Sequence, residues 1–278
     1  MPDSGFRSIE HDPGRLPPEI NTSVAHPARR YDYWLGGKDN FPADRAMGDA
    51  IAEQLPTIRT QVRAQRAFLG RTVRFLAAEA GIHQFLDIGT GIPTTGNVHE
   101  VAQEADPAAR VLYVDNDPIV LAHSRALIPG THSGTVEFIL ADLRKPEAIL
   151  ANPAVAKTLD LTQPVGLVLI GIMHHLRDQD DPRRIVATLV DALAPGSYLV
   201  LSQTTPDFDP EAMAGLAAVS EQGGIPNVPR TLADTEPFFA GLELVEPGLV
   251  PLAAWRPDPG TDQDPYSVYA YGGVARKP

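Results

Sequence analysis

The sequence predicts an α/β fold in which a mostly parallel sheet carries helices on both faces. After Gly81, short apolar runs alternate with segments of helical periodicity, which is the pattern of successive βαβ units. The runs do not alternate with polar residues, as expected for strands that are covered on both faces. Four consecutive runs end in Gly or Asp, so these residues are expected at one edge of the sheet.

The parallel strands are expected in the runs QFLDIG, RVLYVD, VEFILAD, PVGLVLIG and SYLVLS. Helices are expected between them in GNVHEVAQEA, DPIVLAHSRALI and DDPRRIVATLVDAL. The pairs Asp117-Pro118 and Asp181-Pro182 each combine a helix N-cap with a proline at the first helical position. Further helices are expected near 210–220 and 231–240, and the C-terminal YSVYAYGGVARKP predicts a last strand that is antiparallel to its neighbours.

The chain divides into three parts that differ in composition and hydrophobic periodicity. Residues 1–26 are rich in Pro, Gly and charge, lack periodicity, and are expected to form a flexible leader. Residues 27–80 carry a helical pattern and are expected to form an N-terminal helical cap over the sheet edge rather than an independent domain. Residues 81–278 are expected to form the ligand-binding α/β domain.

The amino-acid composition argues against several classes of binding partner and reactive group. The 278 residues carry a net charge of −12, which makes nucleic acid and anionic membranes poor partners. The chain has no cysteine, which excludes disulfides, thiolate nucleophiles and cysteine-bound metals. No apolar run is long enough to span a membrane, and a cytoplasmic protein is expected.

The motif FLDIGTGIPTTGN predicts a nucleotide-binding turn after the first strand of a Rossmann-like fold, although G-x-G taken alone is more often an ordinary tight turn. The strand ends at Asp87, and Gly89 and Gly91 allow the backbone to turn tightly with a ligand close by. A dinucleotide fingerprint needs a third glycine where this chain has Thr94, and no phosphate-binding G-K-[ST] follows.

Three further strand ends offer ligand contacts. Asp115 in VLYVDNDP is placed to accept the hydroxyl protons of a ribose, because Asp117 already occupies the helix-cap position. Asp142 in FILADLR can meet an adenine edge, or it is an ordinary turn aspartate. The fourth strand ends at Gly171 in LVLIGIMHHL.

These motifs resemble those of class I S-adenosylmethionine-dependent methyltransferases. More narrowly, HPARRYDYWLGGKDNFPADR, QFLDIGTGIPTTGNVHEVAQ and YVDNDPIVLAHSRALI resemble an actinobacterial family of such enzymes that was once known only as a domain of unknown function. The resemblance runs from about residue 22 to the C-terminus and implies a seven-stranded sheet and S-adenosylmethionine as cofactor. It places the methionine part over Gly89 and Gly91 and includes Asp87 among the cofactor contacts. It places the ribose at Asp115, the adenine at Asn116, Asp142 and Leu143, and the sulfonium near Gly171 to Met173.

Methyl transfer needs alignment of the reacting groups and, for a hydroxyl acceptor, a general base. His174 and His175 are the candidates, and the alternative for each is a structural histidine at a strand end. On a strand the two side chains would point apart, and no metal site is predicted. The resemblance supports no role for His175, because the family usually has an aromatic residue there.

The stretch YDYWLGGKDNF suggests a lid or a packed helix end. In the first interpretation Tyr31 and Tyr33 close over the cofactor, a hinge lies at Gly36-Gly37, and Arg29 or Arg30 pairs with the cofactor carboxylate. In the second, glycine stops a helix whose aromatic residues, including Trp34, are buried on the sheet.

The expected function is methyl transfer from S-adenosylmethionine to an unidentified, small-molecule acceptor. A non-catalytic sensor or scaffold that binds S-adenosylmethionine is an alternative, because catalysis by positioning requires no invariant nucleophile. A nicotinamide-dependent oxidoreductase is a weaker alternative, because the third glycine of the dinucleotide fingerprint is missing. The sequence predicts no oligomeric state.

Overall fold

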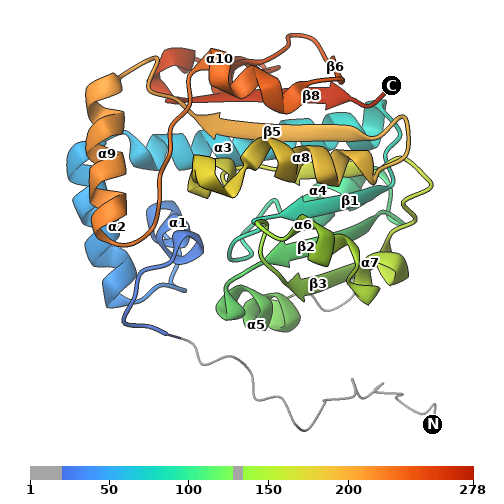
Figure 1. Ribbon diagram of the computed structural model, residues 1–278, viewed down its shortest axis with the longest axis horizontal. Coiled ribbons are helices and arrows are strands. Elements are labelled where there is room, and N and C mark those ends of the chain that lie inside the picture. The colour runs from blue at the N-terminus through green and yellow to red at the C-terminus, as the bar shows by residue number, and fades with distance from the viewer. Residues whose placement is uncertain (1–20, 128–133) are drawn as a thin grey trace, which may run out of the picture.

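The apolar runs after Gly81 form one sheet of eight strands in the described part of the chain, which comprises residues 21–127 and 134–278 of a computed structural model. The strand order is β3-β2-β1-β4-β5-β8-β6, and β7 pairs with β8 (Figure 1). The strands are β1 (Gln84–Ile88), β2 (Arg110–Asp115), β3 (Val136–Leu140), β4 (Gly166–Leu169), β5 (Tyr198–Thr204), β6 (Glu243–Leu244), β7 (Val250–Pro251) and β8 (Ala270–Arg276).

The predicted mostly parallel arrangement is confirmed. Strands β1 to β5 pair in parallel, and β8 runs antiparallel to β5, β6 and β7. The seven strands on the main path correspond to the expected seven-stranded sheet, and the two-residue β7 is an addition to it. The expected leader lies mostly outside the described residues, which begin at residue 21.

The helices are α1 (Pro27–Leu35), α2 (Pro42–Gln54), α3 (Ile58–Arg74), α4 (Val98–Ala105), α5 (Pro118–Leu127), α6 (Pro146–Leu150), α7 (Pro153–Thr158), α8 (Pro182–Asp191), α9 (Pro210–Gln222) and α10 (Leu232–Thr235). A π-helical turn at Phe75–Glu79 continues α3. Short 3-10 turns occupy Met173–His175, Asp178–Asp180, Glu236–Phe239, Leu252–Ala254 and Pro265–Ser267.

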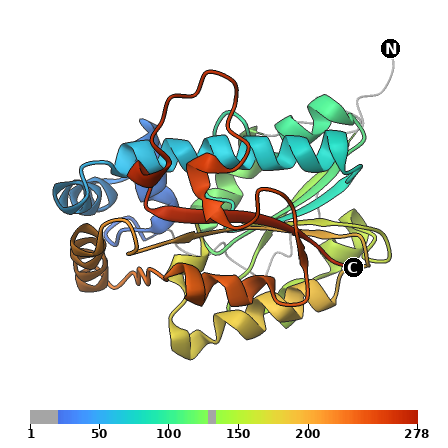
Figure 2. The same ribbon diagram turned by 90° about the horizontal axis from the view of Figure 1, so that it is seen from above.

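Two hydrophobic layers cover the sheet. On one face, Phe85 of β1 packs with Phe68 of α3 and with residues of α4. On the other face, Leu86 of β1 packs with Ile185 of α8 and with residues of α6 and α7. Successive side chains of each strand therefore point to opposite faces and pack in different layers. Figure 2 shows the helices on both sides of the sheet.

Helices α1, α2 and α9 lie beyond the carboxyl ends of the parallel strands, where α3 also begins before it runs along one face of the sheet (Figures 1 and 2). A separate apolar cluster joins them, with Trp34 of α1, Ile51 of α2, Val62 of α3 and Met213 of α9. These helices and the strand ends enclose the space in which the candidate site lies. In the described residues no helix is long and apolar enough to cross a membrane.

Candidate functional site

A cavity of about 350 Å³ lies between the strand ends and helices α1, α3 and α9. This volume is within the usual range for small-molecule sites. The following predicted site residues line it: Tyr31, Asp87, Gly89, Gly91, Asp115, Asn116, Asp142, Leu143, Gly171 and His174. They meet there because the carboxyl ends of adjacent parallel strands share one edge of the sheet.

The turn after β1 needs its glycines for two reasons. Gly89 has a φ of +79°, and a Cβ at this position would lie 2.7 Å from Cγ1 of Ile172. Gly91 has a φ of +70° and donates its N–H to Oδ2 of Asp115 over 2.8 Å. The turn is thereby fastened to the end of β2 beside the cavity.

The carboxylate of Asp115 is held by the backbone. Its oxygens accept hydrogen bonds from the N–H of Gly91 (2.8 Å) and of Asp117 (2.9 Å). Burial raises the pKa of Asp115 above its ordinary value, although these two donors oppose the shift. Asp117 caps α5 by accepting from the N–H of Ile119, as the sequence predicts. Asp115 thus keeps acceptor capacity for ligand hydroxyls.

Asp87 is buried at the end of β1 on the face covered by α3. Burial raises its pKa to about 7, although the positive charge of Arg66 opposes the shift and the charge of Asp115 adds to it. Among the described residues its carboxylate has no hydrogen-bond partner, and it lines the cavity. A cationic ligand group would favour the ionised form of this carboxylate.

Asp142 is already engaged by a neighbouring side chain. Its two oxygens accept from Nε of Arg144 at 3.0 Å, and one accepts from Nη2 at 2.6 Å. Burial alone would raise the pKa of Asp142, but the hydrogen bonds and charge of Arg144 hold it below its ordinary value. Leu143 is 6% exposed and offers an apolar wall beside this pair.

The two histidines do not lie on a strand. β4 ends at Leu169, and Met173–His175 form a 3-10 turn. The expectation that the side chains point apart is therefore wrong: the ring centroids of His174 and His175 are 4.2 Å apart, and both rings line the cavity. Successive residues of a three-residue turn diverge by about 120°, whereas strand neighbours point to opposite faces.

Both histidines are neutral in this environment. Burial, and then the charge of Arg30, lower the pKa of His175 to about 4, although its hydrogen bond to Pro226 opposes the shift. Burial lowers the pKa of His174 well below its ordinary value, and repulsion from a proton on His175 and from the charges of Arg30 and Arg230 adds to the shift. His175 Nδ1 lies 2.8 Å from the carbonyl oxygen of Pro226, which can only accept, so Nδ1 carries the proton and Nε2 is an acceptor.

Glycine ends the first helix, as in the packed-helix interpretation of YDYWLGGKDNF. Gly36 is the left-handed C-cap of α1 with a φ of +87°. A Cβ on Gly37 would collide with the carboxylate of Asp32, which accepts hydrogen bonds from Asp39 and Asn40. Trp34 is 7% exposed and packs in the α1–α2–α3–α9 cluster while also bordering the cavity.

The tyrosines of this stretch have different surroundings. Tyr31 lines the cavity, and its hydroxyl donates to the carbonyl oxygen of Val62 over 2.9 Å. Burial raises its pKa above the ordinary value. Tyr33 lies outside the cavity lining, where its hydroxyl donates to Asp49 over 2.7 Å and Arg59 lies 5.1 Å from its ring.

Three of the predicted contact residues therefore lie outside the cavity wall: Arg29, Tyr33 and Met173. Arg29 donates from Nε to Asp117 over 2.9 Å and lies 3.7 Å from Asp44, so its charge serves the fold. Met173, the first residue of the 3-10 turn, is fully buried in the core. Neither Arg29 nor Tyr33 faces the cavity in this structure, and the expected contacts of these two side chains with a cofactor stay predictions.

Several other residues of the cavity wall were not predicted from the sequence, among them Gln65, Arg66, Thr204 and Asn227. Arg66 lies on the polar side of α3 and donates to the carbonyl oxygen of Thr95 over 3.0 Å, beside the turn after β1. A helical-wheel reading of α3 could have proposed Gln65 and Arg66. No local signal marks Asn227, which reaches the cavity from the irregular segment after α9.

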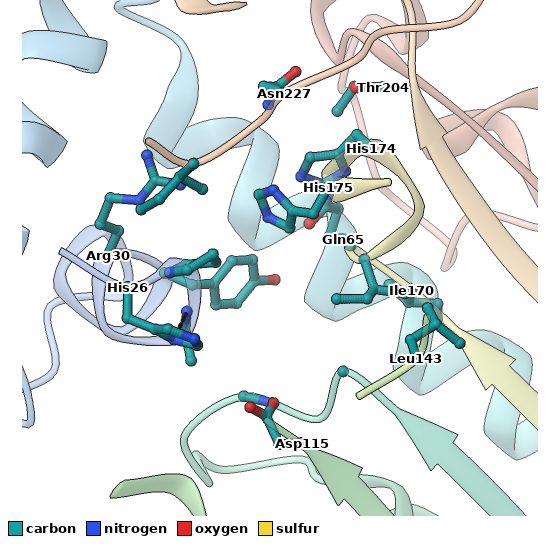
Figure 3. A pocket seen from close by; sticks show the side chains of 18 of the residues that line it. His26, Arg30, Gln65, Asp115, Leu143, Ile170, His174, His175, Thr204 and Asn227 are labelled. Carbon is teal, nitrogen blue, oxygen red and sulfur yellow. Dashed lines mark hydrogen bonds between the residues drawn. The ribbon is translucent and has the colours of Figure 1, made fainter. Parts of the chain in front are cut away.

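Figure 3 shows that the cavity has two chemically different sides. Asp115 lies on one side, whereas Thr204, Asn227 and the two histidines lie on the opposite side. Arg30 reaches in from α1. In the described residues no group of three or more His, Cys, Asp and Glu side chains could hold a metal ion.

Comparison with known proteins places this arrangement in a family. A DUF574 family protein from Streptomyces avermitilis is 46% identical, with 94% of this chain and 100% of that chain covered and a TM-score of 0.91. A protein from Thermobifida fusca that is provisionally described as a methyltransferase is 42% identical, with 94% and 98% covered and a TM-score of 0.88. No protein among those of curated function matches the chain.

The family model described as S-adenosyl methyltransferase matches residues 13–278. The match covers almost the whole chain, including the strand-end motifs whose residues meet at the cavity. The chain belongs to the S-adenosyl methyltransferase family, whose members use S-adenosylmethionine as the methyl donor.

Proposed function

We propose that the protein transfers a methyl group from S-adenosylmethionine to a small-molecule acceptor that occupies the side of the cavity near His175 and Arg30. The two-sided cavity carries this proposal: the Asp115 side offers acceptors for a nucleoside, and the histidine side offers neutral bases and hydrogen-bonding groups. A net charge of −12 supports a small-molecule acceptor over a nucleic acid.

The proposed cofactor contacts follow the strand ends. Asp115 accepts the ribose hydroxyls, Asn116 and Leu143 flank the adenine, and the turn at Gly89 and Gly91 lies under the methionine part. Asp142 is a weaker candidate for the adenine, because Arg144 already occupies its oxygens. These assignments rest on the position of each residue in the cavity wall and on the family resemblance.

The acidic groups near the turn suit a cationic cofactor. S-adenosylmethionine supplies a methyl group on a positively charged sulfonium and also carries an ammonium group. Asp87 places a carboxylate without a hydrogen-bond partner among the described residues in the cavity wall. Arg66, on the neighbouring helix, is the candidate partner for the cofactor carboxylate, because it lies beside the same turn.

Of the two histidines, His175 is the better candidate for a general base. The carbonyl of Pro226 fixes its tautomer and leaves Nε2 without a proton. With a pKa of about 4 the ring is neutral near pH 7, so Nε2 can accept the proton of an acceptor hydroxyl. His174, the candidate from the sequence, shares the wall, but its Nδ1 is buried without a hydrogen-bond partner in the described residues.

We also propose that residues 27–80 act as a cap and belong to the same folding unit as residues 81–278. Helices α1 and α3 contribute Tyr31 and Arg66 to the cavity wall. Helix α3 also packs Phe68 into the core on the sheet. This packing supports a cap that excludes water from the cavity, which strengthens electrostatic interactions inside it.

The cofactor preference is directly measurable. Titration calorimetry on the purified wild-type protein should show binding of S-adenosylmethionine and S-adenosylhomocysteine and no binding of NAD, because the third glycine for a pyrophosphate is replaced by Thr94. Mass spectrometry of the protein as purified serves as a second check for bound cofactor. Binding of NAD with an affinity equal to that of S-adenosylhomocysteine would contradict the proposal.

A further inference from the structure

Buried polar atoms without partners gather in the wall of the cavity. In the described part of the chain, nine buried side-chain nitrogen and oxygen atoms lack a hydrogen-bond partner. Five of these atoms belong to cavity-lining residues, and they are Nε of Arg30, Nδ1 of His174, Oγ1 of Thr204, Oγ of Ser220 and Oδ1 of Asn227. A buried polar atom without a partner is destabilising, so such a concentration in residues that line one cavity points to a ligand that completes the hydrogen bonds.

These five residues come from distant parts of the chain. Arg30 lies on α1, His174 on the 3-10 turn after β4, Thr204 at the end of β5, Ser220 on α9, and Asn227 in the segment after α9. Those that Figure 3 labels lie away from Asp115. The carboxylate of Asp115, by contrast, already accepts two backbone hydrogen bonds. The unsatisfied groups therefore mark the side opposite the proposed ribose contact.

Arg30 supplies the charge of this group. Its side chain is buried with 3% of its surface exposed, its Nη1 lies 3.3 Å from the sulfur of Met47, and its guanidinium lies 5.7 Å from the ring centroid of Trp34. Among the described residues no carboxylate lies within ion-pair distance of it, and the nearby Asp44 pairs with Arg29. Burial lowers the pKa of Arg30 to about 10, so the group remains charged near pH 7.

We propose that these groups form the acceptor subsite and that the acceptor carries a carboxylate, which pairs with Arg30. The inference rests on the proposed methyltransferase function and identifies the class of its acceptor. A guanidinium presents a planar fork that matches a carboxylate in two parallel hydrogen bonds. Thr204, Ser220 and Asn227 then meet hydroxyl, amine or carbonyl groups of the same molecule.

The charge balance favours a carboxylate over a phosphate ester. Arg30 is the cation on this side among the described wall residues, because His174 and His175 are neutral. One buried cation matches a single negative charge, whereas a phosphate monoester carries a charge of about −1.5 to −2 near neutral pH. A dianion would therefore enter with one charge left unpaired, which is costly in a buried site.

The alternative partner for Arg30 is the cofactor's own carboxylate. Arg66 is better placed for that group, because its Nη2 donates to Thr95 and lies near Asn97 in the turn that follows Gly89 and Gly91. Arg30 instead influences the histidines, since its charge lowers the pKa of both His174 and His175.

The test uses the full chain saturated with S-adenosylhomocysteine. The probes are benzoate, phenylacetate and 4-hydroxybenzoate, each compared with its own primary amide, which keeps the shape and removes the charge. Ligand-detected NMR titration should show at least one of the carboxylates binding about tenfold or more tightly than its amide. In Arg30→Gln that preference should fall to within about twofold, and the affinity for S-adenosylhomocysteine should stay within about threefold.

The control is Arg63→Gln, which makes the same charge change at an exposed residue of α3 outside the cavity wall and should keep the full preference. Arg30→Lys retains the charge without the planar fork and should keep an intermediate preference, so it provides the test if Arg30→Gln does not fold. Three results would overturn the proposal. These are equal binding of every carboxylate and its amide by the wild type, an unchanged preference in Arg30→Gln, and a loss of more than about tenfold in S-adenosylhomocysteine affinity in that variant. Failure of the wild type to bind S-adenosylhomocysteine would instead reject the proposed function itself.

Discussion

Replacing Asp115 by alanine is expected to weaken the binding of S-adenosylhomocysteine by about 1.5–3 kcal/mol, which is roughly a 10- to 150-fold rise in the dissociation constant. The variant removes the charged acceptor at the end of β2 that we assign to the ribose hydroxyls. It also removes the hydrogen bonds that fix Gly91 and Asp117, at 2.8 and 2.9 Å. Both losses act in the same direction, so the expected effect is large.

Two further variants separate these contributions. Asp115→Asn keeps the shape and one acceptor oxygen, so it can still hold one backbone N–H, and its loss of affinity should be smaller than that of Asp115→Ala. Asp142→Ala removes a carboxylate that Arg144 already occupies, so its effect should be within about threefold. Calorimetry measures the affinity of each of the three variants for S-adenosylhomocysteine. Wild-type affinity in Asp115→Ala would remove Asp115 from the site.

Replacing Asp87 by asparagine is expected to change how stability depends on pH. Burial raises the pKa of Asp87 from its ordinary value near 3.8 to about 7. Between these two values the folded protein holds a proton that the unfolded chain has released. The stabilisation from the protonated group is thus complete below about pH 4 and is lost as pH rises to about 7. The asparagine side chain of the variant cannot ionise, so the variant lacks this contribution to the decline.

The difference between the two proteins can be measured by urea unfolding without cofactor. From pH 5.5 to pH 8, the stability of Asp87→Asn relative to the wild type should increase by about 2 kcal/mol, because up to about pH 7 the folded wild type keeps the proton of Asp87 whereas the unfolded chain has released it. Asp115 is present in both proteins, so its own titration contributes to both curves. An equal stability difference at the two pH values would show that Asp87 titrates near its ordinary pKa.

The strand-end part of the site was accessible from sequence because its signals are local. Asp87, Gly89, Asp115, Asn116 and Gly171 each follow a short apolar run, and a parallel sheet brings such ends together without knowledge of any loop. The same reasoning predicted the helix caps at Asp117 and Asp181, whose side chains accept from backbone N–H groups in the first turn. Local geometry and sheet topology were sufficient for these residues.

The other side of the cavity depends on packing between distant segments. Arg29 and Arg30 are adjacent in one motif, and helix neighbours diverge by about 100°, so only the docking of α1 decides which guanidinium faces Asp117 and which faces the cavity. The prediction that His174 and His175 lie on a strand was wrong because β4 ends at Leu169. The apolar residues continue beyond Leu169, so the sequence does not show where this strand ends. Asn227 has no motif at all, and it reaches the site through the path of the chain after α9.

A crystal structure of the protein with S-adenosylhomocysteine tests the central claim most directly, namely that one side of the cavity holds the cofactor and the other receives the acceptor. The expected result has the ribose hydroxyls within hydrogen-bonding distance of the Asp115 carboxylate. The thioether sulfur should face the histidine side, with the Arg30 guanidinium still without a partner from the cofactor. A ribose away from Asp115, or a cofactor carboxylate paired with Arg30, would contradict the account.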